Sequence, residues 1–182
     1  MYSIVDIETT GGLAAENAIT EIAILQHDGE RVVKEYQTLI NPRQPITPYV
    51  VRLTGISNAM VASAPVFEEV AEQVFSLLHN RIFVAHNVGF DHTYINLQLQ
   101  ACGLQLNTPK LCTVQMSRKF IPGMESYSLG RLCRSLGIGL EDRHRAMGDA
   151  RATALLFDRL LANGAEAYIN KTVKKKVGIG LK

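Results

Sequence analysis

Cysteines and long apolar runs are scarce in this sequence. Its three cysteines, Cys102, Cys112 and Cys133, are odd in number and form no CxxC pair. This pattern excludes a disulfide framework and a cysteine-ligated zinc site, so we interpret them as buried or half-buried thiols of a reducing cytoplasm. No apolar run approaches the ~18 residues that a membrane-spanning helix needs. The first residues lead straight into a strand, without a basic and apolar leader, so we expect a cytoplasmic protein with no membrane partner.

Internal repeats, low-complexity tracts and linkers rich in proline or serine are also absent from the body of the chain. Its 182 residues, 47% apolar and 20% charged, suffice for one globular domain with a sizeable core. The last clear helical pattern ends on Gly164, and the residues beyond it lack a periodic apolar face. We therefore expect one domain over residues 1–164 and a basic C-terminal tail or linker over residues 165–182.

Positive charge is concentrated in two places. The residues from Lys171 onward include five lysines and no acid, whereas the residues before them hold 14 basic and 17 acidic side chains, a net charge of −3. Between Arg118 and Arg159, eight basic residues face five acidic ones. A basic tail on an acidic body is compatible with a polyanionic partner, and equally with a solvated linker.

The hydrophobic pattern predicts a mixed α/β fold. Residues 2–9 read as a strand, and residues 18–42 read as two further strands joined by Asp28-Gly29, a strong hairpin signal. Residues 81–87 are apolar until their end, as expected for a central strand covered on both faces. Helices are expected within residues 64–80, 88–103, 110–120, 126–138 and 146–163. This order predicts an antiparallel meander plus parallel strands, with helices on both faces of the sheet.

Two acids interrupt the opening strand, MYSIVDIETTGG. Alternation along a strand places Asp6 and Glu8 on one face, and Val5 and Ile7 on the other. Neighbouring carboxylates on a core strand repel each other and lose hydration, which is tolerable only with a cation between them. An edge strand with a solvated polar face would explain the same pattern.

A third acid follows the strand over residues 81–87. In the segment AHNVGFD the apolar run ends in His86-Asn87, and Asp91 falls in the first turn of the helix that follows. Strand ends and the helix starts beside them form the ligand crevice of open α/β sheets, so Asp91 can project into such a crevice. An aspartate at a helix start is also a common cap.

A histidine and a fourth acid occur in the segment DRHRAMGDARAT. A spacing of five separates two residues by ~140° on a continuous helix. The two can therefore face one site only if His144 lies in the loop and Asp149 in the first helical turn. Gly148 allows a ligand or another backbone segment to approach closely. Alternatively, His144 is an exposed loop residue and Asp149 pairs with Arg145 or Arg151.

The segments VDIETTG, AHNVGFD and HRAMGDARAT, in this order, resemble the three exonuclease motifs of the DEDD superfamily, histidine subclass. LTGIS and SYSLGRLCRSLGI resemble intervening segments, so the similarity extends from Tyr2 to about Gly164. It is greatest to the proofreading epsilon subunits of bacterial DNA polymerase III and their stand-alone relatives. The resemblance implies a ribonuclease H-like fold with a mixed five-stranded sheet. It also implies metal-dependent 3′-to-5′ hydrolysis of DNA that releases nucleoside 5′-monophosphates.

The same resemblance implies catalytic roles for Asp6, Glu8, Asp91, Asp149 and His144. The four acids match the metal ligands of the family, and hard oxygen ligands suit Mg²⁺ or Mn²⁺. Two ions are expected per active site, with Asp6 bridging them. Glu8 and Asp149 would hold the ion that carries the attacking water, and Asp91 would hold the second. His144 is expected to take the proton from that water.

Four further residues are expected, by resemblance, to bind the terminal nucleotide: Thr9, Leu53, His86 and Phe90. The main chain of Thr9 would contact the 3′-hydroxyl, and the other three would line the sugar and base. Phe90 offers a contact that tolerates any base, and it would serve equally well as a core residue. The expected partners are single-stranded DNA or frayed 3′ ends, and a DNA polymerase subunit. The alternatives are an exoribonuclease that trims RNA ends or short oligoribonucleotides, and a non-catalytic subunit of a polymerase complex.

Overall fold

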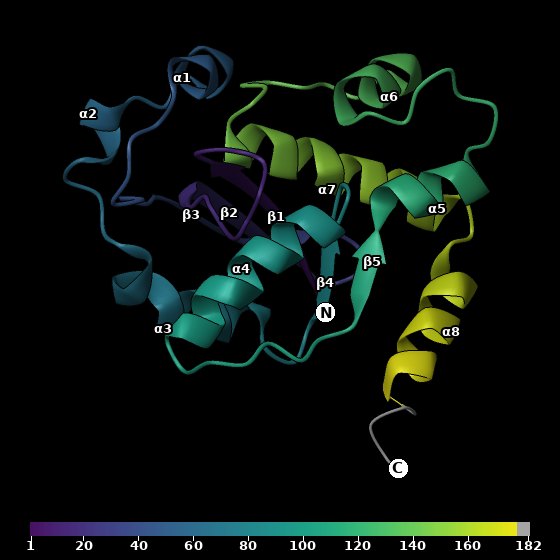
Figure 1. Cartoon of the computed structure of the whole chain (residues 1–182). Helices are drawn as coiled ribbons and strands as arrows, with labels where there is room; N and C mark the ends of the chain where they lie inside the picture. The colour runs from purple at the N-terminus through teal and green to yellow at the C-terminus, as the bar shows by residue number, and fades with distance from the viewer. Residues whose placement is uncertain (178–182) are drawn as a thin grey trace.

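A five-stranded mixed sheet lies at the centre of the molecule (Figure 1). The computed structural model describes the backbone of residues 1–177 and the side chains of residues 1–173. The strands are β1 (Tyr2–Thr9), β2 (Ile19–His27), β3 (Val32–Leu39), β4 (Ile82–Ala85) and β5 (Lys110–Cys112). Their order is β3-β2-β1-β4-β5, with β1, β2 and β3 antiparallel and with β1, β4 and β5 parallel. The predicted meander continued by parallel strands is confirmed.

Helices cover both faces of this sheet. The described helices are α1 (Pro48–Thr54), α2 (Asn58–Val61), α3 (Phe67–Leu78), α4 (Gly89–Ala101), α5 (Thr113–Phe120), α6 (Leu129–Leu136), α7 (Ala146–Ala162) and α8 (Glu166–Val177). Side chains of α3 and α4 form one core with one face of the sheet, and side chains of α5 to α8 form a second core with the other face. In the described part of the chain, no helix is long and apolar enough to cross a membrane.

The alternation of β1 decides which face carries its two acids. Val5 and Ile7 belong to the core shared with α3 and α4, whereas Ile4 belongs to the core shared with α7. Because side chains alternate along a strand, Asp6 and Glu8 point to the same side as Ile4. Both carboxylates therefore lie on the face of the sheet that α7 covers.

The conformation of residues 110–112 differs from the sequence prediction. Residues 110–120 were expected to form one short helix, but residues 110–112 form β5 and the helix begins only at Thr113. Leu111 and Cys112 are buried and pair in parallel with Val84 and Ala85 of β4. A strand of three residues leaves no alternation to read in the sequence, so its pairing with β4 decides its conformation.

The segment after Gly164 also differs from the expected tail without an apolar face. Ala165 and Ile169 are fully buried, and Tyr168 and Val173 pack against the core that contains α7. The Tyr168 ring meets Phe120 of α5 edge to face, with 5.7 Å between the ring centroids. The apolar residues of this segment recur at helical spacing, with polar residues between them. The apolar residues pack against α5 and α7, and this packing stabilises α8. The start of the segment is thus part of the packed structure, and the domain boundary itself stays a prediction.

Candidate active site

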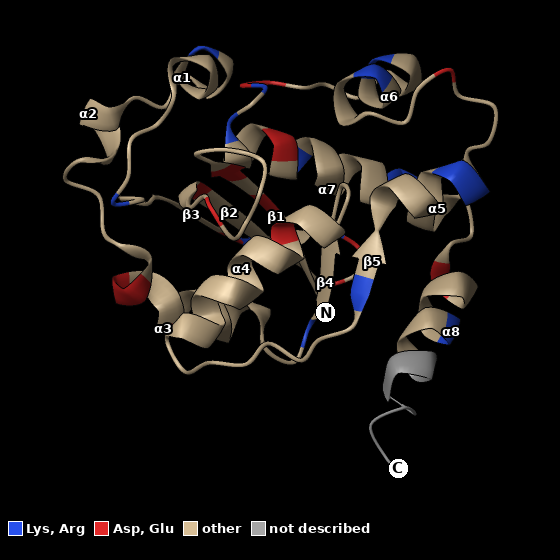
Figure 2. Ribbon diagram, in the orientation of Figure 1, with Lys and Arg blue, Asp and Glu red and all other residues tan. Residues whose placement is uncertain are grey.

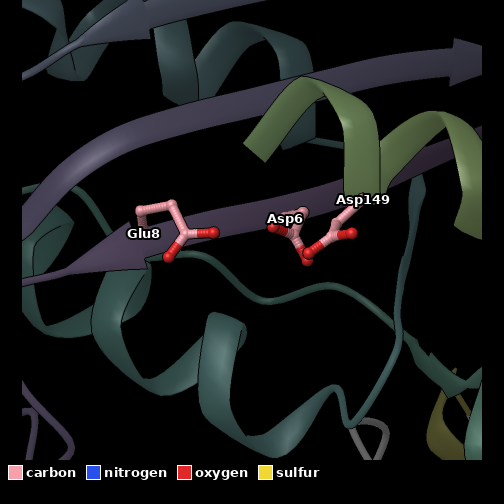
Figure 3. Close-up of side chains that lie close together, drawn as sticks. All are labelled: Asp6, Glu8 and Asp149. Atoms are coloured by element: carbon pink, nitrogen blue, oxygen red, sulfur yellow. The ribbon is translucent and has the colours of Figure 1, made fainter. Parts of the chain in front are cut away.

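Carboxylates from β1 and α7 meet on one face of the sheet. The cluster consists of Asp6, Glu8 and Asp149. One carboxylate oxygen of each residue lies within 4.8 Å of those of the other two. Figure 3 shows Asp6 and Glu8 on the strand, and Asp149 pointing toward Asp6 from the helix above it. Acids that are separated in the sequence therefore form a single cluster.

The close packing of the chain around Gly148 helps to place Asp149 in this cluster. Asp149 lies in the first turn of α7, next to Gly148. A Cβ atom added to Gly148 would overlap the carbonyl oxygens of Glu141 and Asp142. The predicted close approach to Gly148 is confirmed, and the approaching group is the backbone of Glu141 and Asp142. Only glycine lets the loop before α7 fold back this tightly over the first helical turn.

His144 lies in that loop, immediately before α7. Its backbone has a φ of +62°, in the left-handed region that is uncommon for a residue other than glycine. The His144 N–H donates a hydrogen bond to Oδ2 of Asp149 at 3.3 Å. The structure therefore meets the condition set by the spacing of five, because the histidine lies in the loop and the acid in the first helical turn.

The fourth acid, Asp91, lies in the first turn of α4 and is buried, with 4% of its surface exposed. It is not one of the three acids grouped within 4.8 Å. It is nevertheless a near neighbour, because its charge is the largest contribution after burial that raises the pKa of Asp6. Backbone hydrogen bonds from Asp91 itself and from Ile7 counteract the effect of burial on the pKa of Asp91.

Burial raises the pKa of all four acids, and repulsion between carboxylates raises it further for Asp6 and Glu8. Burial, followed by repulsion from Asp149, raises the pKa of Glu8 to about 8, and burial raises that of Asp91 to about 7. Burial is also the main cause of the raised pKa values of Asp6 and Asp149. Oδ1 of Asp149 is buried and has no hydrogen-bond partner in the described structure. Clustered carboxylates with raised pKa values fit a divalent cation, so these residues could hold a metal ion.

The raised pKa values predict how stability depends on pH in the absence of metal. A carboxyl whose pKa is higher in the folded than in the unfolded protein binds more protons when folded. Its contribution to stability is then fully present below the unfolded value, about 4, and is lost as the pH rises through the folded value. We expect the thermal midpoint of the metal-free protein to fall as the pH rises toward about 8, the raised pKa of Glu8.

This prediction is tested by calorimetry over that pH range on the wild type and on Glu8→Gln, with and without Mg²⁺. Glu8→Gln should flatten the fall, because a neutral amide takes the place of the buried carboxyl. Mg²⁺ should raise the wild-type midpoint more at pH 8 than at pH 5. An identical pH dependence in the two proteins would contradict the assignment of these acids to a cation site.

A cavity of about 460 Å³ lies beside Glu8. Three of the four predicted nucleotide-binding residues line it: Thr9, Leu53 and Phe90. Phe90 also packs against Tyr94, with 4.9 Å between the ring centroids, so it contacts both the core and the cavity. The cavity lies next to the acid cluster and is open to solvent on the side of α1, where Leu53 is 41% exposed.

His86 is the fourth predicted nucleotide-binding residue, and it is not among the residues that line this cavity. Its Nδ1 lies 2.9 Å from Oγ1 of Thr113, and its Nε2 lies 2.9 Å from the carbonyl oxygen of Tyr127. These bonds connect the end of β4 to α5 and to the segment before α6. Since both ring nitrogens are engaged within the chain, a contact of His86 with a nucleotide could use only the ring carbons, and this role stays a prediction.

One group beside the site was missed by the sequence analysis. Glu21 of β2 is buried, with 1% of its surface exposed, and forms an ion pair with Arg145. The sequence contains a pattern that could have indicated Glu21. It is a lone acid in the apolar run ITEIAIL, just as Asp6 and Glu8 are acids in an apolar strand. Its partner could not be predicted, since the two residues lie 124 positions apart.

Comparisons with known proteins agree with this arrangement. A family model described as Exonuclease, RNase T, matches residues 3–157. The 3′-5′ exonuclease DinG of Bacillus subtilis is 38% identical over 162 residues, which make up 88% of this chain and 17% of that protein. The DNA polymerase III subunit epsilon of Aquifex aeolicus is 32% identical over 161 residues, 88% of this chain and 80% of that protein. The structure of Exonuclease X in complex with 5′ overhanging duplex DNA has a TM-score of 0.72 at 26% identity, over 97% of this chain and 99% of that one.

Several of the curated relatives are much longer than this chain, which spans 17%, 28% and 12% of three of them. The family model, by contrast, matches most of the chain and includes all four acids and His144. With this match and a half-buried cluster of acids that could hold a metal ion, the chain belongs to the RNase T family of metal-dependent exonucleases.

Proposed function

We propose that this chain hydrolyses DNA from the 3′ end, one nucleotide at a time, and releases nucleoside 5′-monophosphates in proofreading or repair. The observation that carries the proposal is the half-buried group of Asp6, Glu8 and Asp149, in which one carboxylate oxygen of each residue lies within 4.8 Å of the others. The names of the Bacillus and Aquifex relatives, and the duplex DNA in the Exonuclease X structure, support the direction and the substrate. Association with a DNA polymerase subunit, by analogy with the Aquifex protein, is part of the proposal.

The acids would hold two Mg²⁺ or Mn²⁺ ions. Asp6, with its raised pKa and its place between the other carboxylates, would bridge them. Glu8 and Asp149 would bind one ion, and Asp91 would bind the other, directly or through water. When bound, such ions stabilise the charge that develops on the attacked phosphate and ease deprotonation of the attacking water.

The other groups of the site would orient the reactants. His144 would accept the proton of the attacking water, and the hydrogen bond between its N–H and Asp149 keeps its loop beside the acids. The main chain of Thr9 would contact the terminal 3′-hydroxyl. Leu53 and Phe90, which line the cavity beside Glu8, would hold the sugar and base without selecting among bases.

A cationic surface beside the acids would hold the strand upstream of the cleaved bond. We define the α5–α6 face by the exposed arginines Arg118, Arg131, Arg134 and Arg143. Figure 2 shows basic segments on both helices. None of the four forms an ion pair with the side chains described here. Exposed cations without acidic partners are free to contact phosphates.

This face is connected to the active site by packing. The guanidinium of Arg143, the residue before His144, lies against Gly130 at the start of α6, where an added Cβ would come within 3.0 Å of it. Arg118 lies over the ring of Tyr127 at 5.2 Å, and the Tyr127 carbonyl is the hydrogen-bond partner of His86. A strand whose 3′ end lies at the acids could therefore extend over α6.

Removing charge from the α5–α6 face should weaken binding without slowing catalysis. Each phosphate contact on a single strand contributes about −0.7 to the slope of log affinity against log salt. Arg131→Ala/Arg134→Ala should therefore flatten this slope and raise KM at physiological salt, with kcat unchanged. Initial rates on a labelled oligonucleotide at several salt concentrations measure both quantities.

The matched control is Arg31→Ala/Lys34→Ala, which removes two exposed charges at the β2–β3 hairpin, beside the opposite end of β1. The control should keep the wild-type slope. Equal slopes in both double variants would contradict a role for this face. The tail lysines, apart from Lys171, lie outside the described side chains, and their contact with phosphates stays a prediction.

The experiment that tests the proposed function compares matched DNA and RNA oligonucleotides labelled at either end. A 3′-to-5′ exonuclease releases a 3′-terminal label at once as a mononucleotide, and it shortens 5′-labelled strands in single-nucleotide steps. Faster degradation of RNA than of DNA would indicate that the chain is an exoribonuclease, the alternative to the proposed function. An absence of degradation of either strand in Mg²⁺ and Mn²⁺ would favour a non-catalytic subunit.

A further inference from the structure

The carboxylate of Glu21 is bound by four donors from two parts of the chain. Arg145 donates from Nε to Oε2 at 3.0 Å and from Nη2 to Oε1 at 2.6 Å. The Ala146 N–H donates to Oε2 at 2.9 Å, and the side-chain amide of Gln37 donates to Oε1 at 2.8 Å. Burial alone would raise the pKa of Glu21, but these hydrogen bonds outweigh it and lower the pKa. Glu21 is therefore a buried, fully paired anion.

The place of this anion in the fold connects it to the active site. In the antiparallel pairing of β1 and β2, Glu21 lies directly opposite Glu8. Three of its four donors belong to Arg145, the residue after His144, and to Ala146, the first residue of the helix α7 that carries Asp149. One side chain of the sheet thus holds both the end of the His144 loop and the start of α7 next to Glu8.

The loop needs such a contact, because His144 has a left-handed backbone conformation. That conformation is unfavourable for a residue with a Cβ and persists only where the surroundings hold it. The His144 N–H is bonded to Asp149 on one side, and Arg145 is bonded to Glu21 on the other. If the second contact is lost, the loop can relax and move the imidazole away from the acids.

We infer that Glu21 is a positioning residue, which acts through Arg145 to fix His144 and Asp149 against Glu8. This inference rests on the proposed function, since it assigns a contribution to the rate of hydrolysis. Glu21 itself touches neither substrate nor metal in this account. A misplacement of catalytic groups by about 1 Å can cost roughly 10²-fold in rate, so its contribution should be measurable.

The same fold supplies a matched control, a purely structural hydrogen bond. His27 of β2 and Asp158 of α7 lie 2.9 Å apart and connect the same strand to the same helix. Asp158 lies nine residues beyond Asp149, about 13 Å along the helix at 1.5 Å per residue. Asp158→Asn should therefore lower the thermal midpoint with little effect on kcat.

The decisive variant is Glu21→Gln/Arg145→Met, which removes both charges together. The glutamine can still accept the Ala146 hydrogen bond, and an uncharged pair leaves no buried ion without a partner, so the protein should remain folded. Arg145→Lys is the second variant, because lysine keeps the charge but cannot bind a carboxylate through two parallel hydrogen bonds. Thermal midpoint, kcat and KM on a labelled oligonucleotide, and Mn²⁺ affinity are measured for all variants.

For the paired substitution we expect a near-wild-type midpoint, a roughly 10- to 100-fold loss of kcat, a weaker Mn²⁺ affinity and an unchanged KM. Arg145→Lys should show a smaller loss of kcat in the same direction. Wild-type kcat in either folded variant, or a lowered midpoint with little change in kcat, as expected for Asp158→Asn, would overturn the inference. An inactive wild-type chain would instead overturn the proposed function.

Discussion

Removal of divalent metal is expected to abolish hydrolysis, and Mg²⁺ or Mn²⁺ is expected to restore it. The four acids of the site have raised pKa values because they are desolvated, and repulsion between carboxylates adds to this effect at Asp6 and Glu8. A metal ion in such a site contributes several kcal/mol of transition-state stabilisation, and each 1.36 kcal/mol is a factor of ten in rate. Chelation should therefore reduce the rate by about 10³-fold or more.

The substitution Asp6→Asn should have the same effect at saturating Mg²⁺. It keeps the size of the side chain but removes the charge of the acid whose pKa is raised by burial and by repulsion from Asp91, Asp149 and Glu8. Ca²⁺ should support DNA binding better than turnover, because its looser coordination misplaces the attacking water. Asp158→Asn, a loss of charge at the far end of α7, serves as the control and should keep full activity. Undiminished cleavage in excess chelator would contradict the metal-dependent mechanism.

The second large effect is expected for His144→Ala. A general base contributes about 10²–10⁴-fold to rate, so kcat should fall by this factor. The loop retains the backbone hydrogen bond to Asp149, because the His144 N–H rather than its imidazole makes it. Metal affinity and the binding of a nucleoside 5′-monophosphate should therefore stay close to wild type. Calorimetric titration with Mn²⁺ and with the nucleotide separates this outcome from a collapsed site.

His144→Asn provides a further comparison, because it keeps a polar side chain but cannot act as a base. It should be as slow as His144→Ala. Near-normal turnover of His144→Ala would exclude a catalytic role, and the residue would then only shape the loop. Loss of metal binding in the same variant would instead indicate that the imidazole supports the acids.

Much of the acid site could be predicted from local patterns in the sequence. The alternation of the opening strand places Asp6 and Glu8 on one face, and the structure confirms this placement. The spacing of His144 and Asp149 requires a loop followed by a helix start, as the structure has it. These features are local, so the residues themselves carry the necessary information.

The features that could not be predicted depend on contacts between distant segments. β5 forms because β4 supplies a pairing edge, and α8 because α5 and α7 supply an apolar surface. The ion pair of Glu21 with Arg145 joins residues 124 positions apart. Both ring nitrogens of His86 are engaged by α5 and by the segment before α6, which no spacing within AHNVGFD could indicate.

The most direct test of the central claim is anomalous diffraction from crystals of the chain grown with Mn²⁺ and a nucleoside 5′-monophosphate. The account predicts Mn²⁺ peaks between the carboxylates of Asp6, Glu8 and Asp149, with a second ion held by Asp6 on the side of Asp91. The nucleotide should lie in the cavity beside Glu8, with its phosphate at the ions. Absence of metal at these carboxylates, with the nucleotide bound elsewhere on the molecule, would contradict the account.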